Sequence, residues 1–307
     1  MKDKVGIVGL GIMGSAMANN LLKDGFSVVG YDVRDDAFDA FTDAGGERAN
    51  SPREVAERAR IVITSLPTPG ALSAVMSGND GIKTAKGAGQ IIVECSTMPI
   101  ELKQEAYDAL TAAGMVMLDC PLSGTGAQAA RKDLVVFASG DADAFARCRG
   151  VFAGMSRVQQ YLGAFGNGSK MKYIANHLVT IHNVAAAEAI VLGIKAGLDP
   201  QVVYDVISDS AGSSRMFQVR GQMMVDGDYD QATATISMQI KDIEIIGKFA
   251  SELGCAMPVF ASAAQFYYAG HGQGRTKQDT AAVCAVLEEM TGVERPPAKG
   301  RNNAAKA

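Results

Sequence analysis

Hydrophobic and polar positions change their pattern midway along the chain. In the first half, short apolar runs alternate with stretches of helical periodicity. The runs predict strands at residues 5–8, 27–31, 61–65, 91–94, 115–118 and 134–138. Helices are predicted at residues 13–22, 51–59 and 101–113, and the second of these opens on a Ser-Pro-Arg-Glu capping box. This alternation predicts an α/β domain with a doubly wound parallel sheet.

After Gly166 the pattern becomes helical throughout. Residues 169–196 contain no proline and a single glycine, Gly193, and predict one helix of about 28 residues, roughly 40 Å long. Asp199-Pro200 is expected to open the next helix, and further helices are predicted at residues 216–224, 237–253, 257–268 and 280–290. The fold expected is therefore a doubly wound α/β domain, joined by the long helix to an all-α C-terminal domain.

The length of the chain agrees with two domains. At 307 residues it exceeds what one hydrophobic core usually organises. We place the first domain at residues 1–165 and the second at residues 166–294. Residues 295–307 form a tail without an apolar period, which is expected to be mobile.

Composition excludes several classes of partner. The formal net charge of -4 gives no electrostatic reason to expect nucleic acid or an anionic membrane surface. No apolar run is expected to approach the length needed to span a bilayer, and nothing resembles a signal peptide, so we expect a cytoplasmic protein. The five cysteines are odd in number and widely spread, as is typical of reduced, mostly buried thiols.

A glycine-rich turn follows the first predicted strand and opens the first helix. The turn reads Gly9-Leu10-Gly11-Ile12-Met13-Gly14. Gly9 permits the tight turn, Gly11 lets the backbone approach a pyrophosphate, and Gly14 allows close packing of helix on strand. Ile12 and Met13 stand at the entrance of the helix. This pattern, directly after a strand, predicts a Rossmann-type dinucleotide site.

Asp32 ends the second strand and is expected to bind the ribose hydroxyls of the adenosine. A carboxylate there repels a 2′-phosphate, so NAD is favoured over NADP. Arg34 favours NADP instead, because a nearby guanidinium would accept that phosphate. At other strand ends, Leu66 is expected to pack on the cofactor and Thr97 to bond near the nicotinamide ribose. The alternatives are turn chemistry at the strand ends and, for Ser96 or Thr97, a helix N-cap before Pro99.

The segment 119–126 follows another strand and offers a hydroxyl and glycine N–H groups. Ser123, Gly124 and Thr125 are expected to form a small pocket that accepts an anion such as a carboxylate. Read in isolation, the same segment is equally an ordinary flexible turn.

Lys172 and Asn176 lie four residues apart at the start of the long helix, so one helical face carries an amine and an amide. Oxidation of an alcohol requires removal of the hydroxyl proton as hydride leaves, and a lysine of lowered pKa serves this purpose. Asn176 orients the substrate oxygen. Thr180 and Asn183 extend the polar stripe, which favours this interpretation over that of a solvent-facing lysine.

Other polar residues are less distinctive. Lys241, followed by Asp242, would bind the substrate carboxylate or lower the pKa of Lys172 by repulsion. An exposed charge paired with a neighbour is the alternative. The three histidines lie beside no carboxylate in sequence, so packing and surface roles are favoured for them. No cluster has the spacing of metal ligands, and no metal is expected.

The chain resembles the β-hydroxyacid dehydrogenases of the 3-hydroxyisobutyrate dehydrogenase family, from Val5 to about Met290. Four motifs carry the resemblance, at residues 9–21 (GLGxMGxxMAxNL), 119–126, 166–176 and 241–242. It implies a Rossmann-type domain, an all-α domain that drives assembly into a homodimer or homotetramer, and an NAD(P)-linked reaction. That reaction is oxidation of a short 3-hydroxyacid or reduction of its semialdehyde.

The resemblance also implies residue roles. Lys172 matches the catalytic lysine, and Asn176 matches the second member of an Asn pair. Ser123 and Gly124 match the loop that binds the substrate carboxylate, and Lys241 matches a lysine near substrate and nicotinamide. Two positions depart from the pattern: Ala175 replaces the first Asn of the pair, and Thr125 replaces a second glycine.

These departures place 3-hydroxyisobutyrate itself in doubt as the substrate. Arg215 lies in a segment that resembles the one contacting the far end of the substrate. It suggests a second anionic or polyhydroxylated group, as in threonate-like acids. Two other functions stay open: an imine reductase, whose members usually replace the lysine, and a non-catalytic nucleotide-binding interaction protein.

Overall fold

The computed structural model describes residues 4–293, and the predicted tail at 295–307 lies outside the described residues. The chain divides inside one long helix into two compact units, residues 1–174 and 175–307. This boundary and the boundary predicted at residues 165 and 166 lie on either side of the first turns of that helix.

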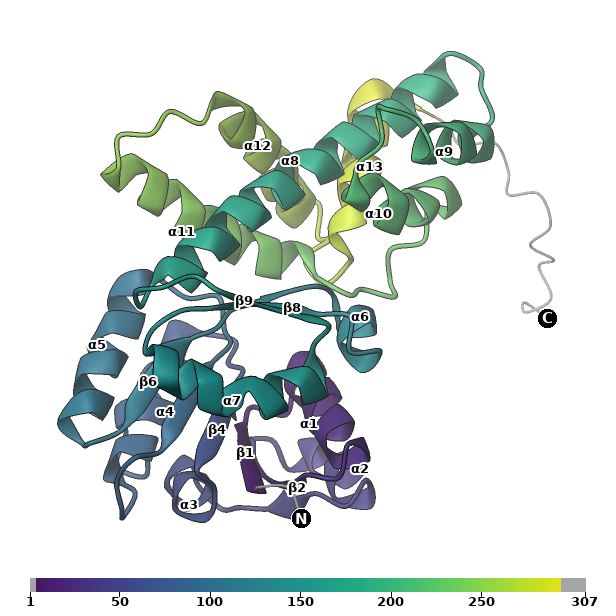
Figure 1. Ribbon diagram of the computed structural model, residues 1–307. Coiled ribbons are helices and arrows are strands. Elements are labelled where there is room, and N and C mark those ends of the chain that lie inside the picture. The colour runs from purple at the N-terminus through teal and green to yellow at the C-terminus, as the bar shows by residue number, and fades with distance from the viewer. Residues whose placement is uncertain (1–3, 294–307) are drawn as a thin grey trace. The chain divides into compact units, whose positions relative to one another are not determined.

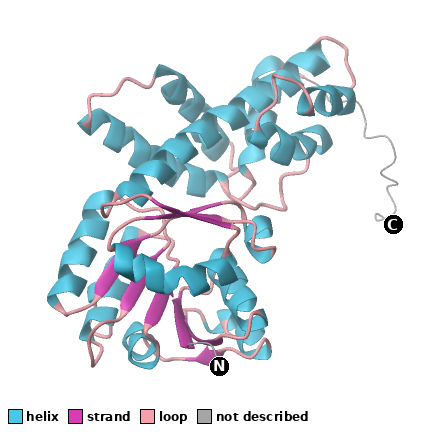
Figure 2. Ribbon diagram, in the orientation of Figure 1, coloured by secondary structure: helices cyan, strands magenta, loops and turns pink. Residues whose placement is uncertain are grey.

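The first unit is built on a six-stranded sheet (Figures 1 and 2). Its strands are β1 Lys4–Val8, β2 Ser27–Tyr31, β3 Glu47–Arg48, β4 Ile61–Thr64, β5 Ile91–Glu94 and β6 Val116–Asp119. They are ordered β3-β2-β1-β4-β5-β6, and every neighbouring pair is parallel. The doubly wound parallel sheet predicted from the sequence is confirmed. The strand order reverses between β1 and β4, where ligands of such sheets bind.

Helices cover both faces of this sheet. The unit contains α1 Ile12–Lys23, α2 Asp39–Asp43, α3 Pro52–Arg58, α4 Pro69–Ser77, α5 Ile100–Ala112, α6 Gly126–Ala130 and α7 Ala142–Met155, with short 3-10 turns η1 Asp35–Ala37 and η2 Ile82–Thr84. Side chains of α1 and α7 share one apolar core with β1 residues Val5 and Ile7. Side chains of α3, α4 and α5 share the other core with Val8. The alternation of strand side chains between faces produces this division.

The predicted strand at residues 134–138 does not join the large sheet, and that expectation was wrong. It forms β8 Val135–Ala138 in a separate sheet with β7 Leu122–Ser123 and β9 Val158–Tyr161. β7 starts directly after β6, so it cannot return parallel to β6 through a crossover. β8 pairs antiparallel with β7 and parallel with β9. An isolated bridge from Asp119 to Ser139 links this small sheet to the end of β6.

Four helices of this unit, α2, α4, α6 and α7, were not predicted, although α4 and α7 each have a capping residue. Thr68 caps α4, and Asp141 caps α7, each by accepting a first-turn amide hydrogen bond. The predicted capping box of α3 is half formed. Ser51 accepts from the Glu54 amide, but the Glu54 carboxylate accepts from Asn50 in place of Ser51.

Helices dominate the described residues of the second unit, as predicted, with one isolated bridge between Thr235 and Asp279 (Figure 2). Its helices are the remainder of α8 Asn167–Lys195, then α9 Pro200–Ser208, α10 Arg215–Asp226, α11 Ile236–Glu252, α12 Pro258–Gly272, η3 Thr280–Ala282 and α13 Val283–Thr291. Asp199 caps α9 at the predicted position.

Helix α8 is long and apolar enough to cross a membrane by length and composition, so the expectation that no run reaches that length was wrong. Core helices of other proteins share this length and composition. In the second unit the polar stripe of α8 is buried and bonded. Gln239 donates to the Thr180 hydroxyl at 2.8 Å, and Asn183 donates to the Tyr267 hydroxyl at 3.2 Å.

Candidate active site

The glycine turn occupies the point where the strand order reverses. A Cβ at Gly9 (φ +93°) would lie 2.2 Å from the Ser65 carbonyl oxygen at the end of β4. A Cβ at Gly14 would lie 1.8 Å from the Gly9 carbonyl oxygen, so α1 sits directly on the turn. A Cβ at Gly11 would have no neighbouring atom within 4 Å. Gly11 precedes α1 without a side-chain cap, so the amides of the first turn face an open cradle.

Asp32 stands at the end of β2 and contacts this turn. Its carboxylate accepts hydrogen bonds from the Leu10 amide at 2.7 Å and from the Arg34 amide at 2.9 Å. The Arg34 guanidinium lies 3.5 Å from the same carboxylate, while more than half of its side chain remains exposed. The open cradle and this anchored carboxylate fit the pyrophosphate and ribose of a nicotinamide dinucleotide, which would supply a hydride acceptor when bound.

The ends of β4 and β5 are joined by a side chain. The Ser96 hydroxyl accepts from the Leu66 amide at 2.8 Å, which holds the half-buried Leu66 at the carboxyl edge of the sheet. Thr97 lies at the same edge and is half-buried. Pro99 precedes α5 without a side-chain cap, so the alternative of Thr97 as the N-cap of that helix is wrong.

The predicted anion loop begins directly after β6. Ser123 is half-buried, and Gly124 is exposed. Thr125 serves as the N-cap of α6: its hydroxyl accepts from the Gln128 amide, and the Gln128 side chain accepts from the Thr125 amide. A Cβ at Gly126 would lie 2.4 Å from Cγ2 of Ile12, so this loop touches the start of α1. The loop and the glycine turn are therefore neighbours.

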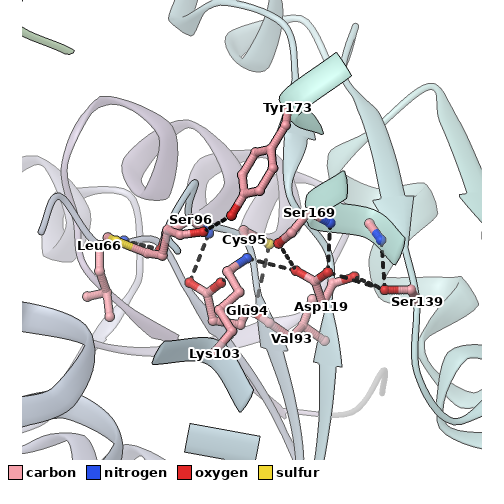
Figure 3. Close-up of polar contacts among 12 residues, drawn as sticks. Leu66, Val93, Glu94, Cys95, Ser96, Lys103, Asp119, Ser139, Ser169 and Tyr173 are labelled. Carbon is pink, nitrogen blue, oxygen red and sulfur yellow. Dashed lines mark hydrogen bonds and ion pairs between the residues drawn. The ribbon is translucent and has the colours of Figure 1, made fainter. Parts of the chain in front are cut away.

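A buried ionic cluster, not predicted from the sequence, lies under this edge (Figure 3). The Lys103 ammonium lies between two carboxylates, 2.6 Å from Glu94 and 2.7 Å from Asp119. The side chains of all three residues are at most 1% exposed. Burial alone would lower the pKa of Lys103, but the charges of Asp119 and Glu94 outweigh it and hold that pKa well above its ordinary value. Lys103 is therefore a cation at neutral pH.

The start of α8 is bonded to the same cluster (Figure 3). Ser169 donates to Asp119 through its amide at 2.7 Å and through its hydroxyl at 2.8 Å. Ser139 accepts from the Gly168 amide at 2.9 Å and donates to Asp119. The sequence carried one signal for this arrangement, a lysine at a helical position facing an apolar sheet.

Lys172 follows one turn later and is half-buried. Its neighbour Tyr173 is buried and donates through its hydroxyl to the Met98 carbonyl oxygen at 2.5 Å. The turn that carries Lys172 is thus anchored to the loop between β5 and α5.

In the second unit, Asn176 is bonded to the pair Lys241-Asp242 on α11. The Asn176 amide donates to Asp242 at 2.6 Å, and the Lys241 ammonium lies 3.1 Å from the same carboxylate. Two motifs separated by 66 residues are thereby brought together. Arg215 opens α10 as an exposed residue, and no polar contact in the described part of the chain joins it to them.

The histidines and cysteines agree with structural roles. His177 stacks on Phe260 with ring centroids 5.2 Å apart. Burial, with a smaller contribution from His182, lowers the pKa of His177. Between residues 4 and 293 no group of three or more metal-binding side chains occurs. Four of the five cysteines are buried, none is in a disulfide, and Cys255 is exposed.

Two family models match the chain in succession. The NAD binding domain of 6-phosphogluconate dehydrogenase matches residues 4–163. The NAD-binding domain of NADP-dependent 3-hydroxyisobutyrate dehydrogenase matches residues 166–287. With the strand order, the glycine turn and the helical second unit, these matches define an oxidoreductase that binds a nicotinamide dinucleotide.

Known proteins similar over nearly the full chain narrow this class. L-threonate dehydrogenase of Cupriavidus necator is 34% identical over 96% of this chain and 99% of its own length. Human mitochondrial 3-hydroxyisobutyrate dehydrogenase is 32% identical over 94% of this chain and 88% of its own length. A crystal structure of 3-hydroxyisobutyrate dehydrogenase from Salmonella typhimurium superposes with a TM-score of 0.85 at 32% identity. The match covers 93% of this chain and 100% of that structure's chain. The chain belongs to the β-hydroxyacid dehydrogenase family.

Proposed function

We propose that this protein is an NAD(P)-dependent dehydrogenase of a short-chain 3-hydroxyacid, working reversibly with the matching semialdehyde, and that Lys172 transfers the proton. The proposal is supported above all by Lys172 in a half-buried, anchored turn of α8, one turn before Asn176. Relatives named for hydroxyacid substrates, at 30–34% identity over nearly the whole chain, add to it.

The chemistry requires one proton and one hydride to leave the alcohol. The neutral Lys172 amine accepts the hydroxyl proton as the carbon–hydrogen bond breaks, and the dinucleotide would supply the hydride acceptor when bound. Asn176 donates one amide hydrogen to Asp242 and keeps its amide oxygen and second hydrogen for the substrate hydroxyl. Ser123 and the glycine amides of its loop bind the carboxylate, and Lys241 provides positive charge.

Two relatives and one residue support a proposal for the substrate class. L-threonate and 2-(hydroxymethyl)glutarate, named in two relatives, are 3-hydroxyacids that carry additional polar groups. Exposed Arg215 is a candidate for binding such a group. We propose a polyhydroxylated or dicarboxylic 3-hydroxyacid, with NAD favoured over NADP because of Asp32.

Assays of the purified protein test this proposal. Reduction of NAD or NADP is measured with L-threonate, 3-hydroxyisobutyrate and 2-(hydroxymethyl)glutarate. In a separate assay, oxidation of the reduced cofactor is measured with a cyclic imine. We expect turnover with at least one hydroxyacid, lowered by about 10²- to 10⁴-fold in Lys172→Ala. Lys170→Ala is the matched control, an exposed lysine two residues earlier on the same helix. Turnover of the imine alone, equal losses in both variants, or binding without turnover would contradict the proposal.

Assembly and location stay predictions. Exposed apolar side chains of the second unit include Leu178, Leu192, Val202 and Val206. These are candidates for the predicted homodimer or homotetramer contact, and light scattering of the purified protein measures its mass. Fractionation of cells tests the cytoplasmic location.

A further inference from the structure

We propose that the buried cluster of Lys103, Glu94 and Asp119 positions Lys172, because it holds the first turn of helix α8 against the sheet. Asp119 is then a positioning residue for proton transfer. The inference rests on the proposed role of Lys172. It concerns residues that carry no chemistry of their own in the reaction.

Asp119 replaces the cap that α8 lacks locally. The residue before α8 is Gly166, which has no side chain to accept the first-turn amides. Asp119 accepts the Ser169 amide directly, and Ser139 accepts the Gly168 amide while bonding to Asp119. A carboxylate at this end also interacts favourably with the helix dipole. The anchor of α8 therefore comes from a residue 50 positions away in the chain.

Charge makes this anchor rigid. Two carboxylates face one ammonium, and all three side chains are buried. A buried charge that loses its partner is strongly destabilising, so the three groups stay together. Both oxygens of Asp119 already accept from two donors each: Lys103 and the Ser169 hydroxyl at one, the Ser169 amide and Ser139 at the other. Few alternative arrangements satisfy all of these donors.

The helix start rests directly on the strand ends. A Cβ at Gly168 would lie 2.3 Å from the Phe137 carbonyl oxygen and 2.6 Å from that of Asp119. Lys172 is three residues beyond Ser169, about 4.5 Å further along the axis. The hydroxyl of Tyr173 anchors the other side of the same turn. Any shift of the first turn therefore displaces the Lys172 amine.

The cluster also reaches the edge where the cofactor is expected. Glu94 accepts from the Ser96 amide at 2.9 Å, and Ser96 accepts from the Leu66 amide at 2.8 Å (Figure 3). One bonded path thus joins the ends of β4, β5 and β6 to the start of α8. This path gives the proton-transfer residue a fixed location relative to the sheet.

Asp119→Asn tests the inference, because either orientation of the new amide places an NH₂ group against donors. We expect kcat to fall by about 10- to 100-fold, as for a misplacement of about 1 Å, with KM for the dinucleotide within about twofold of wild type. Asp24→Asn is the matched control, since it removes the half-exposed ion pair with Lys132 in the same unit. Ser169→Ala, which removes one donor to Asp119, is the milder variant if Asp119→Asn fails to fold.

A double-mutant cycle separates positioning from general destabilisation. If Asp119 acts through Lys172, adding Asp119→Asn to Lys172→Ala lowers kcat no further. An additional loss of the same size as in the wild-type background would overturn the proposal.

Hydrogen exchange of the protein without cofactor gives a readout independent of activity. Amides 168–173 are expected to exchange about tenfold or more faster in Asp119→Asn, and at the wild-type rate in Asp24→Asn. Unchanged exchange there would refute the anchoring, even if wild type oxidised none of the acids. Exchange could be faster while the effects of Asp119→Asn and Lys172→Ala on kcat are additive. Asp119 would then anchor the helix, but the proposal that it positions Lys172 would be overturned.

Discussion

The second unit contains a buried ion pair whose loss has a predictable cost. Arg220 on α10 lies 2.9 Å from Asp279, and the two side chains are 4% and 0% exposed. Asp279 also accepts from the amides of Ala281 at 3.0 Å and Thr233 at 2.9 Å. Asp279→Asn removes the charge that compensates Arg220 and turns an NH₂ group toward one of these donors.

The expected cost is about 3–5 kcal/mol of unfolding free energy, the range for a buried charge left without its partner. The matched control is Glu252→Gln on α11. Glu252 pairs with Lys248 at the same 2.9 Å distance, but the two side chains are 50% and 58% exposed. Its removal should cost only about 0.3–0.5 kcal/mol, because solvent screens the pair. The two ion pairs have the same distance, so the comparison contrasts a buried pair that also accepts backbone amides with an exposed pair.

Cys284 provides an assay specific to this unit, because it is buried in α13. Labelling of its thiol in increasing urea, measured by mass spectrometry, reports unfolding of the second unit even if the two units unfold separately. With a typical slope of about 1–3 kcal/mol per molar urea, Asp279→Asn should lower the midpoint by roughly 1–5 M. A shift no larger than that of Glu252→Gln would refute the argument.

The pH dependence of this effect has a definite sign. Burial alone would raise the pKa of Asp279, but the charge of Arg220 and the amide hydrogen bonds outweigh it and lower that pKa. The stabilisation is therefore complete above the unfolded pKa of about 3.9 and is lost as pH falls through the lower folded value. Wild type and Asp279→Asn should thus differ fully at neutral pH and converge in acid.

Three further predictions concern the site and the thiols. Asp32→Asn keeps an acceptor for the Leu10 amide but removes the negative charge. The ratio of kcat/KM for NADP to that for NAD should therefore rise about tenfold or more. An unchanged ratio would show that Asp32 does not decide the cofactor preference. Asp242→Leu removes the acceptor for the Asn176 amide and should lower kcat about tenfold in steady-state assays, whereas Glu244→Gln, exposed on the same helix, should not. A thiol reagent should label Cys255 alone in the native protein by mass spectrometry, because burial shields the other four and raises the pKa of Cys148 to about 12; rapid labelling of Cys148 would contradict this.

Local patterns in the sequence determined the elements and one binding motif. The alternation of strands and helices, the glycine turn at residues 9–14 and the long helix follow from backbone geometry and from neighbours a few residues apart. For this reason five of the six strands of the large sheet, all but the two-residue β3, and the helices of the second unit were predicted nearly at their observed bounds. The cap of α9 by Asp199 was predicted on the same basis.

Tertiary structure decided what depends on partners distant in the chain. The strand at residues 134–138 reads like any parallel strand, but its partners are β7 and β9 in a different sheet. Lys103 meets Asp119 across 16 residues, and Asp119 meets Ser169 across 50. No periodicity encodes such pairs, because side chains that converge only after the chain has folded have no fixed spacing. The sequence therefore specified the lysine and its helix, and the fold supplied the buried charges that hold that helix in place.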